Sequence, residues 1–198
     1  QSQPGNTGDD LRRVEFVDTQ TGFAAGSNGV LLKTMDGGET WVALNLNTIA
    51  AITDVDFVDA FNGIAAAADG SLYTTADGGI SWQAETLTES ALNTATLFSP
   101  QHVWLTSADG RLFERESAGA EWNEINLGTG GLNKLEMRSP WNGWGVGSGF
   151  MLRRVRTLPA GPDSPYLLQI HSTRLDSFPT VQMFASLRDT VTGDIVTD

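Results

Sequence analysis

The chain has 198 residues, of which 40% are hydrophobic and 22 are glycine, so it is long enough to bury a core as one domain plus an appendage. Its formal net charge of -12 repels phosphate backbones and anionic lipids, which argues against nucleic-acid binding and membrane-surface binding. The absence of cysteine excludes a disulfide framework and a thiolate metal site, and no apolar run is long enough for a membrane-spanning helix.

Residues 1–10 form a polar lead-in that starts Gln1-Ser2-Gln3, without a methionine. Such a start is typical of an exported protein whose signal peptide has been removed. We therefore expect a secreted, periplasmic or cell-surface location.

From residue 11 onward, short β-rich runs alternate with Gly, Asn and Asp turns, and the helical period does not appear. A triplet recurs along the chain as Phe16-Val17-Asp18, Phe57-Val58-Asp59, Phe98-Ser99-Pro100 and Met137-Arg138-Ser139. A tryptophan recurs as well, with 41 residues from Trp41 to Trp82 and 40 from Trp82 to Trp122. A unit of about 40 residues with four short strands has the size of one propeller blade.

We therefore predict an all-β fold, a β-propeller-like array of four blade repeats followed by a C-terminal β-strand tail. The repeats span residues 11–156, at about 11–51, 52–92, 93–131 and 132–156. The Ala-rich runs in the second strands fit the crowded inner part of a propeller, where small side chains let the sheets converge.

Each of the first two repeats contains the same turn, Thr-Met-Asp-Gly-Gly-Glu-Thr-Trp at residues 34–41 and Thr-Ala-Asp-Gly-Gly-Ile-Ser-Trp at residues 75–82. The Asp can accept hydrogen bonds from turn amides, the Gly pair can adopt positive φ, and the Trp begins the next strand and packs between blades. A degenerate third copy of the turn spans residues 115–122, with Ser117 in place of the Asp. The residues expected to build these turns are Thr34, Asp36, Gly38, Thr40, Trp41, Thr75, Asp77, Gly79, Ser81, Trp82, Gly119 and Trp122.

The order Phe-x-Asp, Gly-Phe-Ala-Ala-Gly, Gly-x-Leu-x-x-Thr-x-Asp-Gly-Gly-x-Thr-Trp resembles the Asp-box propeller repeat of the photosystem II assembly and stability factor family, over residues 11 to about 156. Residues 34–41 and 75–82 are called the Asp-box turns below. Asp boxes also occur in sialidases, xyloglucan-cleaving hydrolases and sortilin-type receptors, so the motif indicates a fold more than a function. The resemblance implies a ring of six or more blades, whereas this chain shows four repeats.

The repeat pattern stops after residue 156. Residues 157–165 are a Pro-rich linker, and residues 166–198 alternate as strands do. This tail resembles the opening strands of the Ig-like modules found ahead of von Willebrand A domains in bacterial surface proteins. Two interpretations stay open for it, a truncated Ig-like module or a strand that completes the fourth blade by β-augmentation.

The titratable residues indicate no catalytic centre. Neither His102 nor His171 has a second His or a Cys at metal-ligand spacing, so both are expected to be structural or solvent-facing. The acidic cluster Asp54, Asp56 and Asp59 lacks a calcium-loop pattern, which favours a solvated face over a calcium site. We predict no metal site and no cofactor.

Two further clusters have plain structural interpretations. Residues 145–149, Gly-Val-Gly-Ser-Gly, lack the lysine and the βαβ context of a phosphate-binding loop and are expected to form a blade turn. The basic cluster Arg153, Arg154 and Arg156 lies in one predicted strand, whereas a sialidase needs three convergent arginines on separate blades.

The favoured function is a non-catalytic, extracytoplasmic scaffold for protein–protein interaction, of the assembly-factor or surface-adhesion type. We expect no hydrolase activity, no nucleic-acid partner and no membrane insertion, and self-association through the C-terminal tail. The alternative is a glycan-binding module or the remnant of an Asp-box glycoside hydrolase, with exposed Trp141 as the ligand surface. Trp144 is expected in the core, as the counterpart of Phe23.

Overall fold

The computed structural model describes residues 8–117, 119–127, 131–139, 142–147, 150–157, 167–173 and 181–184. These residues form an all-β fold whose only helix is the single 3₁₀ turn Ser27–Gly29. The all-β prediction is therefore confirmed. None of these residues belongs to a helix with the length and apolar character needed to cross a bilayer.

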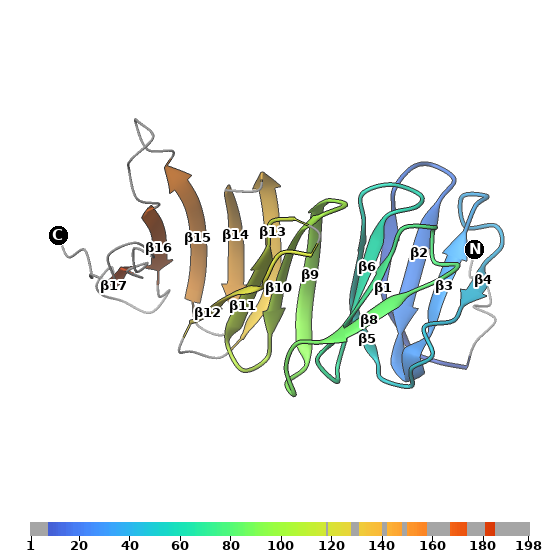
Figure 1. The fold of residues 1–198 in the computed structure, drawn as a ribbon. Helices are drawn as coiled ribbons and strands as arrows, with labels where there is room; N and C mark the ends of the chain where they lie inside the picture. The colour runs from blue at the N-terminus through green and yellow to red at the C-terminus, as the bar shows by residue number, and fades with distance from the viewer. Residues whose placement is uncertain are drawn as a thin grey trace. The chain divides into compact units, whose positions relative to one another are not determined.

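Four antiparallel sheets follow one another along the chain, and each is a meander in sequence order (Figure 1). We call the first three sheets blades 1, 2 and 3. Blade 1 contains β1 (Leu11–Phe16), β2 (Gly22–Gly26), β3 (Leu31–Thr34) and β4 (Val42–Leu44). Blade 2 contains β5 (Ile52–Phe57), β6 (Gly63–Ala67), β7 (Ser71–Thr75) and β8 (Gln83–Thr86). Blade 3 contains β9 (Leu92–Ser99), β10 (His102–Ser107), β11 (Arg111–Arg115) and β12 (Asn123–Asn126).

The fourth sheet has five strands, β13 (Leu132–Ser139), β14 (Asn142–Gly147), β15 (Phe150–Thr157), β16 (Leu167–Thr173) and β17 (Val181–Phe184). In this sheet β16 pairs with β15, and β17 pairs with β16. The chain divides into two compact units, Gln1–Asn133 and Lys134–Asp198, and each is described by itself.

Within the first unit the three blades pack face to face through one apolar cluster at each interface. Phe23, Ala25, Leu31 and Leu46 of blade 1 share a cluster with Ile52, Val55, Phe57, Ala65, Ala67 and Tyr73 of blade 2. Ile64, Ala66 and Leu72 of blade 2 share a second cluster with Leu92, Ala95, Leu97, Val103, Leu105 and Phe113 of blade 3. The strands β1, β5 and β9 lie next to one another in turn, so each blade places its first strand on the inner side of the stack.

The glycine that opens the second strand has a packing role. In blade 1 a Cβ on Gly22 would lie 2.7 Å from the ring of Phe16, and in blade 2 a Cβ on Gly63 would lie 2.2 Å from the ring of Phe57. The missing side chain therefore lets the aromatic ring of the first strand lie across its hydrogen-bonded neighbour. This requirement explains why Phe and Gly recur together in the repeat.

The third repeat is offset by one residue from the alignment that its triplet suggests. Phe57 pairs with Gly63 in blade 2, and the matching pair in blade 3 is Leu97 with Val103. The counterpart of Phe57 is therefore Leu97, and Phe98 is exposed. The alignment of Phe98 with Phe57 was wrong, because side chains alternate between the two faces of a strand and a shift of one residue reverses the face.

The tryptophans that follow the turns stack edge-to-face on aromatic residues of their own blade. Ring centroids are separated by 6.1 Å for Phe16 and Trp41, 6.2 Å for Phe57 and Trp82, and 6.5 Å for Phe113 and Trp122. Trp82 and Trp122 also pack, half-buried, against the two interblade clusters. Trp41 instead lines an open groove on blade 1.

This difference predicts unequal effects of removing the two rings. We expect Trp82→Ala to lower the free energy of unfolding by about 3 kcal/mol, because it removes a ring that packs against an interblade cluster. Trp41→Ala, in the same turn motif but beside the open groove, should cost about 1 kcal/mol. Urea melts of the two variants measure the difference, and equal losses would contradict the assigned packing.

Candidate functional site

The two Asp-box turns have the same hydrogen-bond geometry. In the first, Asp36 Oδ1 accepts hydrogen bonds from Thr34 Oγ1 at 2.7 Å and from the Thr40 amide at 2.8 Å, and Asp36 Oδ2 accepts one from Thr40 Oγ1 at 2.6 Å. Thr34 Oγ1 also accepts a hydrogen bond from the Gly38 amide at 2.9 Å. Both glycines of the turn, Gly37 and Gly38, have positive φ, as the motif predicts.

The second turn repeats these contacts with Thr75, Asp77, Gly79 and Ser81. Asp77 Oδ1 accepts from Thr75 Oγ1 at 2.8 Å and from the Ser81 amide at 2.9 Å, and Asp77 Oδ2 accepts from Ser81 Oγ at 2.6 Å. The Gly79 amide donates to Thr75 Oγ1 at 2.9 Å. The indole N–H of Trp82 donates to the Gly79 carbonyl at 3.1 Å, which joins the ring to its own turn.

These hydrogen bonds lower the pKa of Asp36 and of Asp77 to about 2. The largest contribution comes from the hydroxyl of Thr40 in the first turn and of Ser81 in the second. An anion held by several donors is a poor proton acceptor at neutral pH. The Asp-box carboxylates are therefore structural groups, without the poised pKa of a general acid or base.

The degenerate third copy of the turn keeps Gly119 at positive φ. It has no Asp to accept hydrogen bonds from the turn, and the Ala120 amide instead donates to the Ser117 carbonyl at 3.1 Å. Trp122 of this copy donates its indole N–H to Glu85 of blade 2 at 3.2 Å. Glu85 also accepts a hydrogen bond from Arg115 at 2.6 Å, and the Arg115 guanidinium lies 4.4 Å from the Trp122 ring centroid. An interblade ion pair thus supports the turn that has lost its Asp.

Carboxylates on the inner strands connect each blade to the next. Glu15 of β1 accepts a hydrogen bond from the Phe57 amide of β5 at 3.2 Å, and Asp56 of β5 accepts one from the Leu97 amide of β9 at 2.6 Å. Asp54 accepts from Arg13 of blade 1 at 3.1 Å and from the Ala95 amide of blade 3 at 3.1 Å. The interpretation of Asp54 and Asp56 as a solvated face was wrong, because these side chains satisfy backbone amides between blades.

Asp59, the third member of that acidic cluster, lies in the β5–β6 turn and accepts hydrogen bonds from the Phe61 and Asn62 amides, both at 2.7 Å. Asp18 of blade 1 does the same for Gln20 and Thr21. Among the residues that the structure describes, no group of three His, Cys, Asp or Glu side chains is arranged to hold a metal ion.

The pKa of Glu15, in contrast, is raised to about 9. Burial is the main cause, followed by the neighbouring charge of Asp56 and the hydrogen bond between the two side chains. The protonated form of Glu15 is therefore favoured more than that of an ordinary carboxyl group, and it can donate a hydrogen bond to Asp56. Two carboxyl groups side by side resemble an acid–base pair, but each also accepts a hydrogen bond from the backbone of the next blade.

A lysine makes another interblade contact, at the Asp-box end of the blades. Lys33 of β3 donates to the carbonyls of Ala60 and Gly78 in blade 2, at 3.3 and 3.0 Å, and its Nζ lies 5.3 Å from the Phe23 ring centroid. The two carbonyls belong to the β5–β6 turn and to the second Asp-box turn. The ammonium group thus joins two turns of one blade to the sheet of the preceding blade.

The remaining candidate residues have separate locations. His102 is buried and its Nε2 lies 3.1 Å from Glu114 Oε1, which makes it structural, as expected. The side chain of His171 and those of the three β15 arginines lie outside the described residues, as does Trp141 entirely. Trp144 is exposed in β14, so its expected core position was wrong. Gly145 and Gly147 of the glycine run lie within β14, so this part forms a strand where a turn was predicted.

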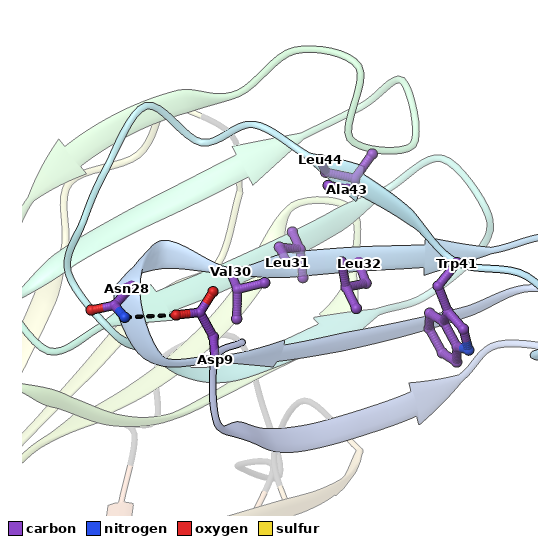
Figure 2. A pocket seen from close by; sticks show the side chains of 8 residues that line it. All are labelled: Asp9, Asn28, Val30, Leu31, Leu32, Trp41, Ala43 and Leu44. Carbon is purple, nitrogen blue, oxygen red and sulfur yellow. Dashed lines mark hydrogen bonds between the residues drawn. The ribbon is translucent and has the colours of Figure 1, made fainter. Parts of the chain in front are cut away.

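Two of the grooves of the molecule are lined by described residues of the first unit. Figure 2 shows one of them, about 440 Å³, on blade 1; Trp41 lies at one end, and Asp9 and Asn28, joined by a 2.6 Å hydrogen bond, lie at the other. The second, about 350 Å³, is lined by residues of blades 2 and 3 that include Glu85, Gln101 and Arg115. Neither of these two grooves is lined by Glu15, Asp54 or Asp56.

The Asp-box hydrogen bonds predict that acid lowers the stability of the fold. A carboxylate whose folded pKa is depressed stabilises the fold above its unfolded pKa, and this contribution is lost as the pH falls through the folded value. We expect Asp36→Asn to lower the free energy of unfolding at pH 6, and its difference from wild type to shrink between about pH 4 and about pH 2. Glu39→Gln, a charge removal in the same turn, is the control. A difference that stays constant down to pH 2 would contradict the assigned role.

Glu15 predicts the opposite pH dependence. A carboxyl group whose folded pKa is raised binds its proton more tightly in the folded state, so its contribution falls as the pH rises from the unfolded value toward about 9. Glu15→Gln keeps an amide oxygen for the Phe57 N–H and cannot ionise. Wild-type stability should therefore decline between about pH 5 and about pH 9 relative to that of Glu15→Gln. Chemical denaturation at several pH values tests this, and parallel profiles would refute it.

The repeat region of the chain is similar to known proteins. Residues 40–135 match the family model described as photosynthesis system II assembly factor YCF48. No curated protein sequence matches the chain.

Several solved structures share the fold. A structure of YCF48 bound to D1 peptide has a TM-score of 0.63 and 20% identity, and the alignment covers 84% of this chain and 65% of that one. YCF48 from Cyanidioschyzon merolae has a TM-score of 0.63 and 16% identity, with 96% and 75% covered. Raptor from Chaetomium thermophilum has a TM-score of 0.58 and 9% identity, with 68% and 14% covered. The chain thus spans about two thirds of the length of the first of these structures.

Because the sequence identity to the two YCF48 structures is 20% or less, their similarity to this chain shows a shared fold and no more. The family match covers the second and third repeats. The expected resemblance is thereby confirmed: the chain is an all-β, propeller-like repeat protein similar to the YCF48 photosystem II assembly factors.

Proposed function

We propose that the chain is a non-catalytic scaffold that binds a segment of a partner protein, in the manner of an assembly factor. The observation that carries this proposal is a set of three large apolar side chains, Met35, Phe61 and Ile80, exposed on rigid turns. We call this set the turn-end patch.

The three residues lie at one end of the first two blades. Met35 and Ile80 belong to the two Asp-box turns, and Phe61 lies in the β5–β6 turn. The Gly78 amide donates to the Phe61 carbonyl at 2.8 Å, so the Phe61 and Ile80 turns are hydrogen-bonded to each other. Lys33 joins them to blade 1, two residues before Met35.

Exposed apolar side chains lower solubility, so their concentration on one end favours an interaction surface. The hydrogen bonds of Asp36, Asp59 and Asp77 hold the turns in one conformation before any partner arrives. A rigid surface loses little conformational entropy on binding, which favours affinity. The second groove, between blades 2 and 3, adds polar lining residues such as Glu85 and Gln101.

The family match and the peptide-bound relative support the same class of partner. One similar structure is of YCF48 bound to D1 peptide, and we propose by analogy that this chain also takes a peptide segment. The analogy rests on fold and family, because the sequence identity is low.

The absence of catalysis is part of the proposal. The pKa values of Asp36 and Asp77 are too low for acid–base work at neutral pH, and the carboxyl groups of Glu15 and Asp56 accept backbone hydrogen bonds between blades.

We also propose that the scaffold works outside the cytoplasm, and that its C-terminal strands contribute to self-association. Cell fractionation and light scattering of a chain that lacks residues 160–198 test these two points.

Binding assays with matched variants test the main proposal. We expect a fluorescently labelled D1 peptide to bind, and the double variant Phe61→Asp/Ile80→Asp to weaken binding by about tenfold or more, because it places charges in an apolar contact. Ile49→Asp is the control, since Ile49 is also exposed but lies in the β4–β5 connection, at the opposite end of the blades.

Two results would contradict the proposed peptide binding. One is equal peptide affinity in the double variant and the Ile49 control. The other is specific binding on a glycan array that Trp141→Ala abolishes, which would favour the glycan-binding alternative. Turnover of a sialoside or β-glucan that depends on one acidic residue would overturn the non-catalytic assignment.

A further inference from the structure

We propose that the turn-end patch recognises a cationic, apolar peptide segment, which has large apolar residues at its centre and a lysine or arginine on either side. The inference rests on the proposed function, because it names the kind of peptide that the patch binds. The charges around the patch, and the order in which the three blades carry them, support it.

The turns before the three repeated tryptophans place a carboxylate on each side of the patch. Two positions before the tryptophan, blade 2 has Ile80 and blade 1 has Glu39. Directly before the tryptophan, blade 2 has Ser81 and blade 3 has Glu121. Glu39 and Glu121 are both exposed, and blade 2 packs against blade 1 on one side and blade 3 on the other. The apolar side chains of blade 2 are therefore flanked by a glutamate from each neighbouring blade.

A second carboxylate of blade 1 lies beside the patch at the β1–β2 turn. The Gly37 amide donates to the Gln20 carbonyl at 2.8 Å, which is the same contact that joins the Phe61 turn to its own Asp-box turn. Gln20 therefore has the place in blade 1 that Phe61 has in blade 2. Asp18, which is exposed, comes two residues before Gln20. The side of the patch toward blade 1 thus carries the charges of both Asp18 and Glu39.

The cations at this end of the blades are engaged in contacts between blades. In the described residues of these turns and of the strand ends beside them, the lysine and arginine residues are Lys33 and Arg115. Lys33 donates to the carbonyls of Ala60 and Gly78, and Arg115 pairs with Glu85 at 2.6 Å. The other charged side chains of the turns are carboxylates, those of Asp18, Asp36, Glu39, Asp59, Asp77, Glu116 and Glu121. The resulting negative field attracts a cationic segment and repels an acidic one.

The stacking of the blades sets the spacing that such a segment needs. Packed sheets lie about 10 Å apart, and an extended chain advances about 3.3 Å per residue. A peptide that crosses from blade 1 to blade 3 with its apolar centre over Phe61 and Ile80 therefore needs a basic residue about three positions to either side. The aliphatic part of a lysine or arginine side chain can also pack on the exposed side chain of Met35.

Two designed peptides test the inference on the intact chain. Both carry a fluorescent label and the same three-residue apolar centre, and the residue three positions to either side is lysine in one and glutamine in the other. We expect the lysine peptide to bind about tenfold more tightly at low ionic strength, because each exposed ion pair contributes about threefold. Glu39→Lys and Glu121→Lys, one on each side of the patch, should each reduce this preference to about threefold or less.

Glu89→Lys is the matched control. It makes the same change in net charge, but the exposed Glu89 lies in the β8–β9 connection, at the opposite end of the blades. This variant should keep the preference of about tenfold. Equal affinity of the two peptides for the wild-type chain overturns the inference. A preference that Glu39→Lys and Glu121→Lys leave unchanged, or that Glu89→Lys reduces as strongly, overturns it as well.

The glutamine peptide separates this inference from the proposed function. The uncharged double variant Phe61→Ser/Ile80→Ser should weaken binding of the glutamine peptide about tenfold, because it removes the apolar contact alone. If it does, and the two peptides bind the wild-type chain equally, the patch binds peptides and the inferred preference for a cationic segment is wrong. If neither peptide binds, or if the serine variant binds both as the wild type does, the proposed function and this inference both fail.

Discussion

The carboxyl-to-amide hydrogen bond between neighbouring inner strands is the interaction on which the first unit depends. Glu15 and Asp56 each accept a backbone N–H from the following blade, at 3.2 and 2.6 Å. The apolar clusters supply most of the favourable free energy of burial, but they are non-directional. The hydrogen bonds set the register between blades and bring the first strands together. One blade alone would leave its apolar face and its inner amides without partners, so stability is a property of neighbouring pairs.

The faces and the ends of the blades therefore have different roles. The faces carry the groups that recognise another blade, which are apolar side chains, an inner amide and two turn carbonyls. The ends carry turns that are complete in themselves, because Thr34, Asp36 and Thr40 satisfy one another locally. Side chains such as Met35 and Ile80 can therefore be exposed for a partner without any loss of contacts within the blade. This arrangement suits a scaffold, in which rigid loops display a surface and the blades hold it.

Sequence reasoning was reliable where the interactions are local. The period of the tryptophans, the alternation of strands and the Thr-x-Asp-Gly-Gly chemistry are contained within a few residues, so they predicted an all-β array of blades and the hydrogen-bonded turns. The family resemblance followed from the same local motif and is supported by the match over residues 40–135. The turn residues were found because each has a partner within four positions in the chain.

The tertiary structure decided every feature that depends on a residue in another blade. Asp54 and Asp56 look like a solvated acidic face in the sequence, yet their partners are amides 41 residues away. The offset of Leu97, the raised pKa of Glu15 and the exposure of Phe16 also follow from what packs on a sheet face. The sequence by itself determined the repeat, its strands and its turns, because those form through short-range contacts. Which carboxyl groups are buried and which apolar face is open depends on the neighbouring blade, and no local pattern records that.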